Sequence, residues 1–220
     1  GYDHIDLDYC RAHDIEVATA AGCNSRGVLQ WVAAALKSAT ERNGSKPCDH
    51  RLGIVGVGNI GRLVEEYALR WGFEVVRCDP PRKRAEGGNF RSIDEVASTC
   101  DIITFHVPLI RSGEDRTVHL AGESFFAQIK PNTMIFNASR GEVIDNELLS
   151  RAITEGRCAA YLDVWENEPT INRELLTQVV AATPHIAGYS AQGKANATAM
   201  SVQAVARKFG LPLESYFPAE

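Results

Sequence analysis

Three ionisable residues follow apolar segments in the second half of the chain. Arg140 comes after "TMIFNAS", Glu168 after "CAAYLDV" and His185 after "QVVAATP". A neutral imidazole can take the proton of an alcohol, and a carboxylate can hold that imidazole in one tautomer. An arginine can bind a substrate carboxylate at two points. The three residue types therefore predict oxidation or reduction at an alcohol carbon, with His185 as the acid–base group.

Each of these residues also has an ordinary structural interpretation. A surface ion pair would explain Arg140, a charge at a helix start would explain Glu168, and a satisfied core histidine would explain His185. What favours catalysis is that all three stand at the ends of predicted strands, where ligands bind in parallel sheets.

A glycine-rich segment lies upstream, in "GIVGVGNIGRL". Gly56, Gly58 and Gly61 have the G-x-G-x-x-G spacing, directly after an apolar strand and at the start of a helix, which is typical of a dinucleotide pyrophosphate site. The predicted next strand ends at Asp79, where a carboxylate would accept hydrogen bonds from an adenosine ribose and disfavour NADP. The basic cluster at 82–84 leaves open that a 2′-phosphate is tolerated.

Strand and helix patterns alternate along the chain. Apolar β-rich runs occur in "RLGIVGVG", "FEVVRCDPP", "CDIITFHVPL", "TMIFNAS", "CAAYLDV" and "QVVAATPH". Helical patterns cover 60–71, 93–98, 122–129 and 146–155, and a long helix is expected from Ser25, as its N-cap, to the stop at Gly44. This alternation predicts an α/β fold, a doubly wound parallel sheet covered by helices.

The pattern divides the chain into four segments. Residues 1–24 contain a brief helix in "IDLDYCRAHDI" and a short strand in "EVATA", too little for a domain of their own. We expect a hinge helix and linker over 25–47, a nucleotide-binding domain over 48–184, and a return segment with a helix over 185–220.

Composition excludes several classes of protein. The net charge is −5 and the longest basic run is "PRKR", so a nucleic-acid partner is not expected. No apolar run reaches a membrane span, which favours a cytoplasmic protein without membrane contact. There is no G-x-S-x-G motif for a hydrolase and no P-loop. The cysteines are too far apart for a zinc site or a disulfide framework, so no metal is expected: Cys10, Cys23, Cys48, Cys78, Cys100 and Cys158.

A family resemblance rests on "VGVGNIG", "CDPP", "TFHVPL", "NASRGEVID", "LDVWENEP" and "TPHIAG". In combination these motifs resemble the D-isomer-specific 2-hydroxyacid dehydrogenases over about residues 1–210. The resemblance implies a Rossmann domain, NAD as the cofactor and a small 2-hydroxy acid as the substrate. Within that family, "AGCNS" and "PHIAGYSAQGKANAT", with Tyr189 where other members usually have a small residue, resemble the members that act on 4-phosphoerythronate, and this resemblance implies a phosphorylated substrate.

The resemblance also implies residue roles. Arg140 would bind the substrate, His185 would exchange the proton, and Glu168 would be its partner. The implied cofactor contacts are the glycine loop with Asn59 and Ile60, Asp79, Val107, Ala138, Ser139, Asp163 and Gly188. Tyr189 would touch the substrate. Independently of the resemblance, Lys194 is a candidate cation for the substrate phosphate, because it lies nine residues after His185. Tyr2 stands where relatives have a substrate-binding threonine, which places that contact in question.

The resemblance further implies a longer protein. Relatives carry a substrate-binding half-domain before the segment that begins here and a dimerisation domain after it. We therefore expect these 220 residues to bind NAD with little turnover, and the full-length protein to be a homodimer. Two alternatives stay open: a dehydrogenase of the 3-phosphoglycerate type, and an NAD-sensing interaction module.

Overall fold

The computed structural model describes residues 3–218, which form two compact units. One unit comprises residues 28–187, and the other comprises residues 1–27 together with 188–220. The division lies near the predicted segment boundaries at 24 and 185. The residues with predicted catalytic roles belong to the larger unit.

A parallel six-stranded sheet is the centre of the larger unit, with the order β2-β1-β3-β4-β5-β6. The strands are β1 (Arg51–Val55), β2 (Glu74–Cys78), β3 (Ile102–Phe105), β4 (Thr133–Asn137), β5 (Cys158–Leu162) and β6 (Ala181–Ala182). All pairings are parallel. The order reverses between β1 and β3, which is where ligands bind in sheets of this kind. Each strand predicted from the apolar runs of this unit is confirmed.

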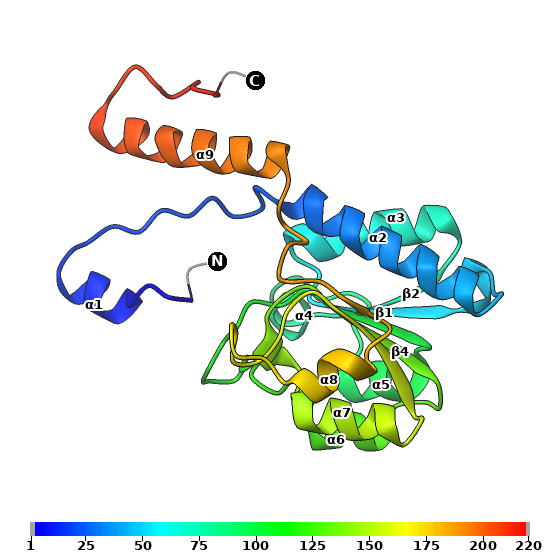
Figure 1. The fold of residues 1–220 in the computed structure, drawn as a ribbon. Coiled ribbons are helices and arrows are strands. Elements are labelled where there is room, and N and C mark those ends of the chain that lie inside the picture. The colour runs from blue at the N-terminus through cyan, green and yellow to red at the C-terminus, as the bar shows by residue number, and fades with distance from the viewer. Residues whose placement is uncertain (1–2, 219–220) are drawn as a thin grey trace. The chain divides into compact units, whose positions relative to one another are not determined.

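Helices cover both faces of the sheet (Figure 1). Helices α2 (Ser25–Arg42) and α3 (Asn59–Trp71) lie on one face, and α5 (Ile93–Thr99), α6 (Glu123–Gln128), α7 (Asn146–Thr154) and α8 (Arg173–Gln178) lie on the other. The remaining elements of this unit are α4 (Pro80–Glu86) and the short 3₁₀ turns η1 (Pro47–Asp49) and η2 (Gly141–Val143). This arrangement confirms the doubly wound prediction.

Two hydrophobic clusters, one on each face, hold the helices to the sheet. The cluster under α2 and α3 includes Leu36, Ile54 and Phe136, and the opposite cluster includes Phe105 and Phe125. Strands β3 and β4 are buried along their whole length. Strands that are apolar on both sides are required where helices cover both faces.

The smaller unit contains α1 (Leu7–Ala12) and α9 (Ala191–Phe209). Ser190 caps α9 by accepting a hydrogen bond from the Gly193 backbone N–H at 3.0 Å. Asn196 Nδ2 donates to the Cys23 backbone oxygen at 3.1 Å, which links the two separate stretches of chain in this unit.

Two local predictions are wrong. The "EVATA" segment, residues 16–20, is irregular, because no described strand lies beside it to complete a ladder. Ser25 is not a capping residue but the first residue of α2, and its buried hydroxyl lacks a hydrogen-bond partner among the described residues.

Candidate active site

The glycine loop joins β1 to the N-terminus of α3. A Cβ added to Gly56 would lie 2.7 Å from the His106 backbone oxygen, and one added to Gly61 would lie 2.0 Å from the Gly56 backbone oxygen. A Cβ at Gly58, the N-cap of α3, would meet no atom within 4 Å. Gly56 and Gly61 are therefore required for packing. Gly58 leaves open space at a helix N-terminus, where a pyrophosphate fits.

Asp79 ties this loop to the end of β2. Its Oδ2 accepts a hydrogen bond from the Val57 backbone N–H at 2.8 Å, and its Oδ1 accepts one from the Arg82 N–H at 3.0 Å. Asp79 is thus the N-cap of α4, a helix that the sequence analysis missed. The signal was present, because an aspartate followed by two prolines is a typical helix start.

Val107 lies at the same loop. A Cβ added to Gly56 would come within 2.8 Å of the Val107 side chain. The preceding residue, His106, is buried, and its Nε2 lies 3.0 Å from Thr104 Oγ1. Burial lowers the pKa of His106 to about 3, so the imidazole is neutral near neutral pH. The predicted adenine contact at Val107 stays a prediction.

His185 and Glu168 form a hydrogen-bonded pair. Nδ1 of His185 lies 2.7 Å from Glu168 Oε2, and the other carboxylate oxygen accepts the Trp165 backbone N–H at 2.8 Å. The side chains are 45% and 34% exposed. A carboxylate at Nδ1 favours the tautomer whose lone pair is on Nε2. No described residue forms a hydrogen bond with Nε2 of His185, so this nitrogen can exchange a proton with a ligand.

Asp163 holds the backbone on both sides of Ile186. This carboxylate is 1% exposed and accepts the Ile186 N–H at 2.8 Å, the Ala187 N–H at 2.9 Å and the Thr183 hydroxyl at 2.5 Å. Its backbone oxygen also accepts the His185 N–H at 2.7 Å. In this structure Asp163 positions the histidine segment, and its predicted contact with a nicotinamide stays a prediction.

Arg140 follows β4, the strand that lies next to β5 in the sheet. Asn137 fixes the turn by donating from Nδ2 to the Arg140 backbone oxygen at 2.9 Å and accepting the Ser139 hydroxyl at 2.7 Å. The Arg140 guanidinium donates to the Ser139 backbone oxygen at 2.7 Å. Because β4, β5 and β6 are consecutive neighbours, Arg140, Glu168 and His185 emerge at the same edge of the sheet.

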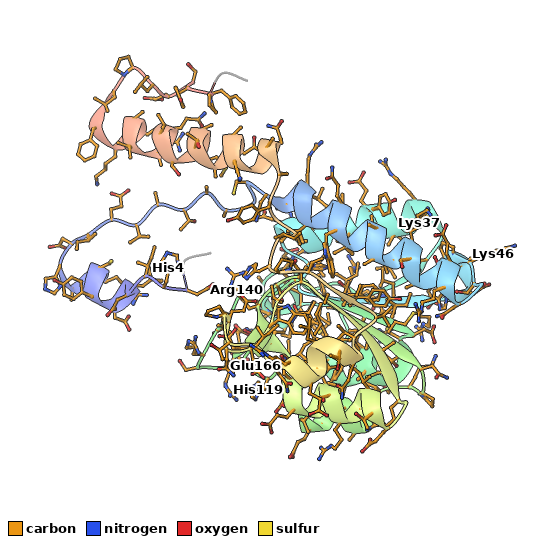
Figure 2. All side chains as sticks on the ribbon, viewed as in Figure 1. His4, Lys37, Lys46, His119, Arg140 and Glu166 are labelled. Atoms are coloured by element: carbon orange, nitrogen blue, oxygen red, sulfur yellow. The ribbon has the colours of Figure 1, made fainter. Side chains whose placement is uncertain are left out.

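A second histidine–glutamate pair, which the sequence analysis missed, lies in the same region. His119 Nε2 is 2.6 Å from Glu166 Oε1, and Figure 2 shows these two side chains together. Glu166 Oε2 accepts the Asn146 N–H at 3.0 Å, at the start of α7. His119 Nδ1 also lies 3.5 Å from Asp145 Oδ2. No spacing in the sequence connects His119 with Glu166, which are 47 residues apart.

Three predicted site residues among the described residues belong to the smaller unit. A Cβ added to Gly188 would lie 2.3 Å from Asn24 Nδ2, so a larger residue here would require the end of the Asn24 side chain to shift. Tyr189 is 71% exposed, and Lys194 Nζ lies 4.8 Å from the centre of its ring. Tyr2 lies outside the described residues.

The other sequence-based expectations concern metals, thiols and membranes. Over residues 3–218 no group of histidine, cysteine, aspartate or glutamate side chains is arranged to hold a metal ion. All six cysteines are free thiols, and burial raises the pKa of Cys78 and Cys158 to about 12. No helix in the described part of the chain is long and apolar enough to span a membrane.

Known proteins resemble this chain over most of its length. Residues 24–187 match the family described as D-isomer specific 2-hydroxyacid dehydrogenase, NAD binding domain. Erythronate-4-phosphate dehydrogenase of Bacteroides thetaiotaomicron is 47% identical over 213 residues, and that of Escherichia coli O9:H4 is 41% identical over 225 residues. These matches cover 96% and 100% of this chain, but only 61% and 60% of the relatives' lengths.

Solved structures agree on the fold. D-mandelate dehydrogenase of Rhodotorula graminis in its apo form superposes with a TM-score of 0.79 at 26% identity, over 100% of this chain and 73% of that one. The TT0316 protein of Thermus thermophilus gives a TM-score of 0.78 at 25% identity, over 96% of this chain and 74% of that one.

Proposed function

This chain belongs to the D-isomer-specific 2-hydroxyacid dehydrogenase family, whose NAD-binding domain it carries over residues 24–187, and from that premise we propose that the full-length protein oxidises a phosphorylated 2-hydroxy acid. The observation that carries the proposal is the His185–Glu168 pair, because it leaves Nε2 of the imidazole without a bond to any described residue. We assign the two residues to proton transfer and Arg140 to substrate binding.

The proposed chemistry removes a proton and a hydride from one alcohol. NAD⁺, when bound, supplies the hydride acceptor. His185 Nε2 takes the hydroxyl proton as the carbon–oxygen double bond forms, while Glu168 stabilises the resulting imidazolium. Arg140 holds the substrate carboxylate and orients the carbon that loses the hydride. In the reverse direction the imidazolium returns the proton to the new alkoxide.

For the substrate we propose 4-phosphoerythronate. The relatives from Bacteroides thetaiotaomicron and Escherichia coli O9:H4, both named erythronate-4-phosphate dehydrogenase, support this choice. Tyr189 and Lys194 are the proposed contacts for its phosphate, since a lysine binds phosphate as a point charge. The reaction would belong to the biosynthesis of pyridoxal phosphate.

The proposed activity is that of the full-length protein, which we expect to be a cytoplasmic homodimer. Residues 1–24 and 185–220 would belong to its substrate-binding part, with 25–47 as the hinge. Residues 1–220 alone are expected to bind NAD with little turnover, because orientation and exclusion of water supply much of the rate of such enzymes.

A substrate panel tests the proposal. NADH formation by the full-length protein is measured with 4-phosphoerythronate, unphosphorylated erythronate and 3-phosphoglycerate. We expect the highest kcat/KM with 4-phosphoerythronate and a loss on removal of its phosphate. A preference for 3-phosphoglycerate would contradict the substrate assignment, and binding of NADH without turnover of any of the three would contradict the activity.

Lys194→Gln tests the phosphate contact. The expected result is a KM raised about tenfold for 4-phosphoerythronate, and no change for the unphosphorylated acid. Lys37→Gln is the matched control, because Lys37 pairs with Glu41 on α2. An equal effect of both substitutions would show that only net charge matters.

A further inference from the structure

The adenosine end of the cofactor site contains a second charged residue besides Asp79. The backbone of Val57, in the glycine loop, is held by two side chains: its N–H donates to Asp79 Oδ2 at 2.8 Å, and its carbonyl oxygen accepts from Arg82 Nη1 at 2.8 Å. The Arg82 guanidinium therefore stands beside the Asp79 carboxylate at the glycine loop. A ribose bound by Asp79 would have this guanidinium as a neighbour.

Glu86 already accepts hydrogen bonds from two N–H donors of that guanidinium, which together form a fork. Arg82 Nε donates to Glu86 Oε1 at 3.0 Å and Nη2 donates to Oε2 at 2.6 Å, one turn along α4. The hydrogen bonds raise the pKa of Arg82 and lower the pKa of Glu86, so both groups are charged. Glu86 also lies 3.9 Å from a second guanidinium, that of Arg62 on α3.

The other two cations of the "PRKR" segment make no hydrogen bond to the glycine loop in the described part of the chain. Arg84 Nη2 donates to Asp115 at 2.6 Å, and its Nη1 lies 3.2 Å from Glu114. Lys83 acts electrostatically on Glu95, in the first turn of α5. Of these three cations Arg82 is the one bonded to the glycine loop, and Glu86 is the carboxylate that neutralises it.

An arginine fork that takes a carboxylate at two points also takes a phosphate monoester at two points. We propose that Glu86 determines cofactor choice: by filling the Arg82 fork, it excludes dinucleotides whose adenosine ribose carries a 2′-phosphate. A 2′-phosphate would have to displace Glu86 from Arg82 and would remain close to two carboxylates, those of Glu86 and Asp79. Without the charge of Glu86, Arg82 and Arg62 present two cations to that phosphate.

The test is titration calorimetry of NADH and NADPH, which differ only in the 2′-phosphate, into the 220-residue chain and its Glu86→Gln variant. Glutamine keeps the size of the side chain but not the charge. The expected result is NADPH affinity raised about tenfold, the size of one charge-assisted pair, with NADH affinity changed less than about twofold.

Two further variants separate a local effect from a change in net charge. Glu66→Gln makes the same charge change at an exposed Glu66–Arg70 pair on α3, and we expect it to leave the NADPH to NADH ratio unaltered. Adding Arg82→Gln to Glu86→Gln should abolish the gain. An unchanged ratio in Glu86→Gln, an equal shift in Glu66→Gln, or a gain that survives the loss of Arg82 would each overturn the proposal.

Discussion

Two glutamates in the loop after β5 each hold a histidine, and the two pairs are built almost alike. Glu168 accepts the Trp165 N–H with one oxygen and faces His185 Nδ1 with the other at 2.7 Å. Glu166 accepts the Asn146 N–H with one oxygen and faces His119 Nε2 with the other at 2.6 Å. The distances alone do not distinguish a catalytic pair from a structural one.

The two imidazoles differ in what their second nitrogen meets. Nδ1 of His119 lies 3.5 Å from Asp145, so both ring nitrogens of His119 face carboxylates. Nε2 of His185 bonds to no described residue. The glutamate of the His119 pair is also less exposed, at 18% against 34% for Glu168. A histidine can act as a base toward a substrate only if one of its ring nitrogens is not engaged by another group of the protein.

The largest expected difference between the pairs is in turnover. His185→Gln is expected to lower kcat of the full-length protein by about 10²- to 10⁴-fold, the usual contribution of an acid–base group. Binding of NADH, measured by calorimetry, should stay unchanged. His119→Gln is the matched control and should cost less than about tenfold. Similar losses in both variants would remove the distinction between the pairs.

The hydrogen bonds that Asp163 makes to the residues after His185 can be removed separately. Asp163→Ala leaves the N–H groups of Ile186 and Ala187 without their acceptor and is expected to lower the free energy of unfolding by about 3 kcal/mol. Asp163→Asn retains an acceptor oxygen and should lose about half of that. Urea unfolding measures both. No loss on Asp163→Ala would mean that this carboxylate does not hold the segment.

For the His119 pair the expected effect is on stability. Glu166→Ala removes the acceptor of both His119 and the Asn146 N–H, so the free energy of unfolding should fall by about 2 kcal/mol. His119→Ala leaves the Asn146 bond in place and should cost less. If Glu166→Ala left stability unchanged in urea unfolding, the structural role of this pair would be contradicted.

The third histidine near these loops, His106, has no carboxylate and is buried. Its pKa of about 3 lies below the 6.5 of an unperturbed imidazole, so between these values the unfolded chain binds a proton that the folded chain does not. The free energy of unfolding therefore falls as the pH falls through this range, by up to about 1.4 kcal/mol per pH unit from this group. His106→Gln should make the pH dependence of urea unfolding between about pH 6 and 4 less steep. Equal slopes in the two proteins would contradict this interpretation.

The sequence correctly predicted features that depend on the local order of residues, such as where a strand ends or a helix begins. Arg140, Glu168 and His185 each follow an apolar strand, and neighbouring parallel strands bring their ends to one edge of the sheet. The glycine spacing likewise fixed the start of α3. Apolar periodicity and glycine spacing were sufficient to place these residues at element ends, whereas the strand order comes from the structure.

What the sequence did not predict depended on contacts between distant segments. Glu166 stands in the same motif as Glu168, but its partner His119 comes from a different loop. The strand expected at 16–20 is irregular because strand formation needs a neighbour that local sequence does not show. Arg82 and Glu86 have the i, i+4 spacing of a helical ion pair. That spacing brings two side chains together only within a helix, and α4 was not predicted.

The kcat/KM of the two histidine variants of the full-length protein tests most directly which histidine exchanges the proton. We expect His119→Gln to stay within about tenfold of the unaltered protein, and His185→Gln to lose most of its turnover while it still binds NADH. If His185→Gln kept its turnover and His119→Gln lost it, the assignment of the acid–base group to His185 would be wrong.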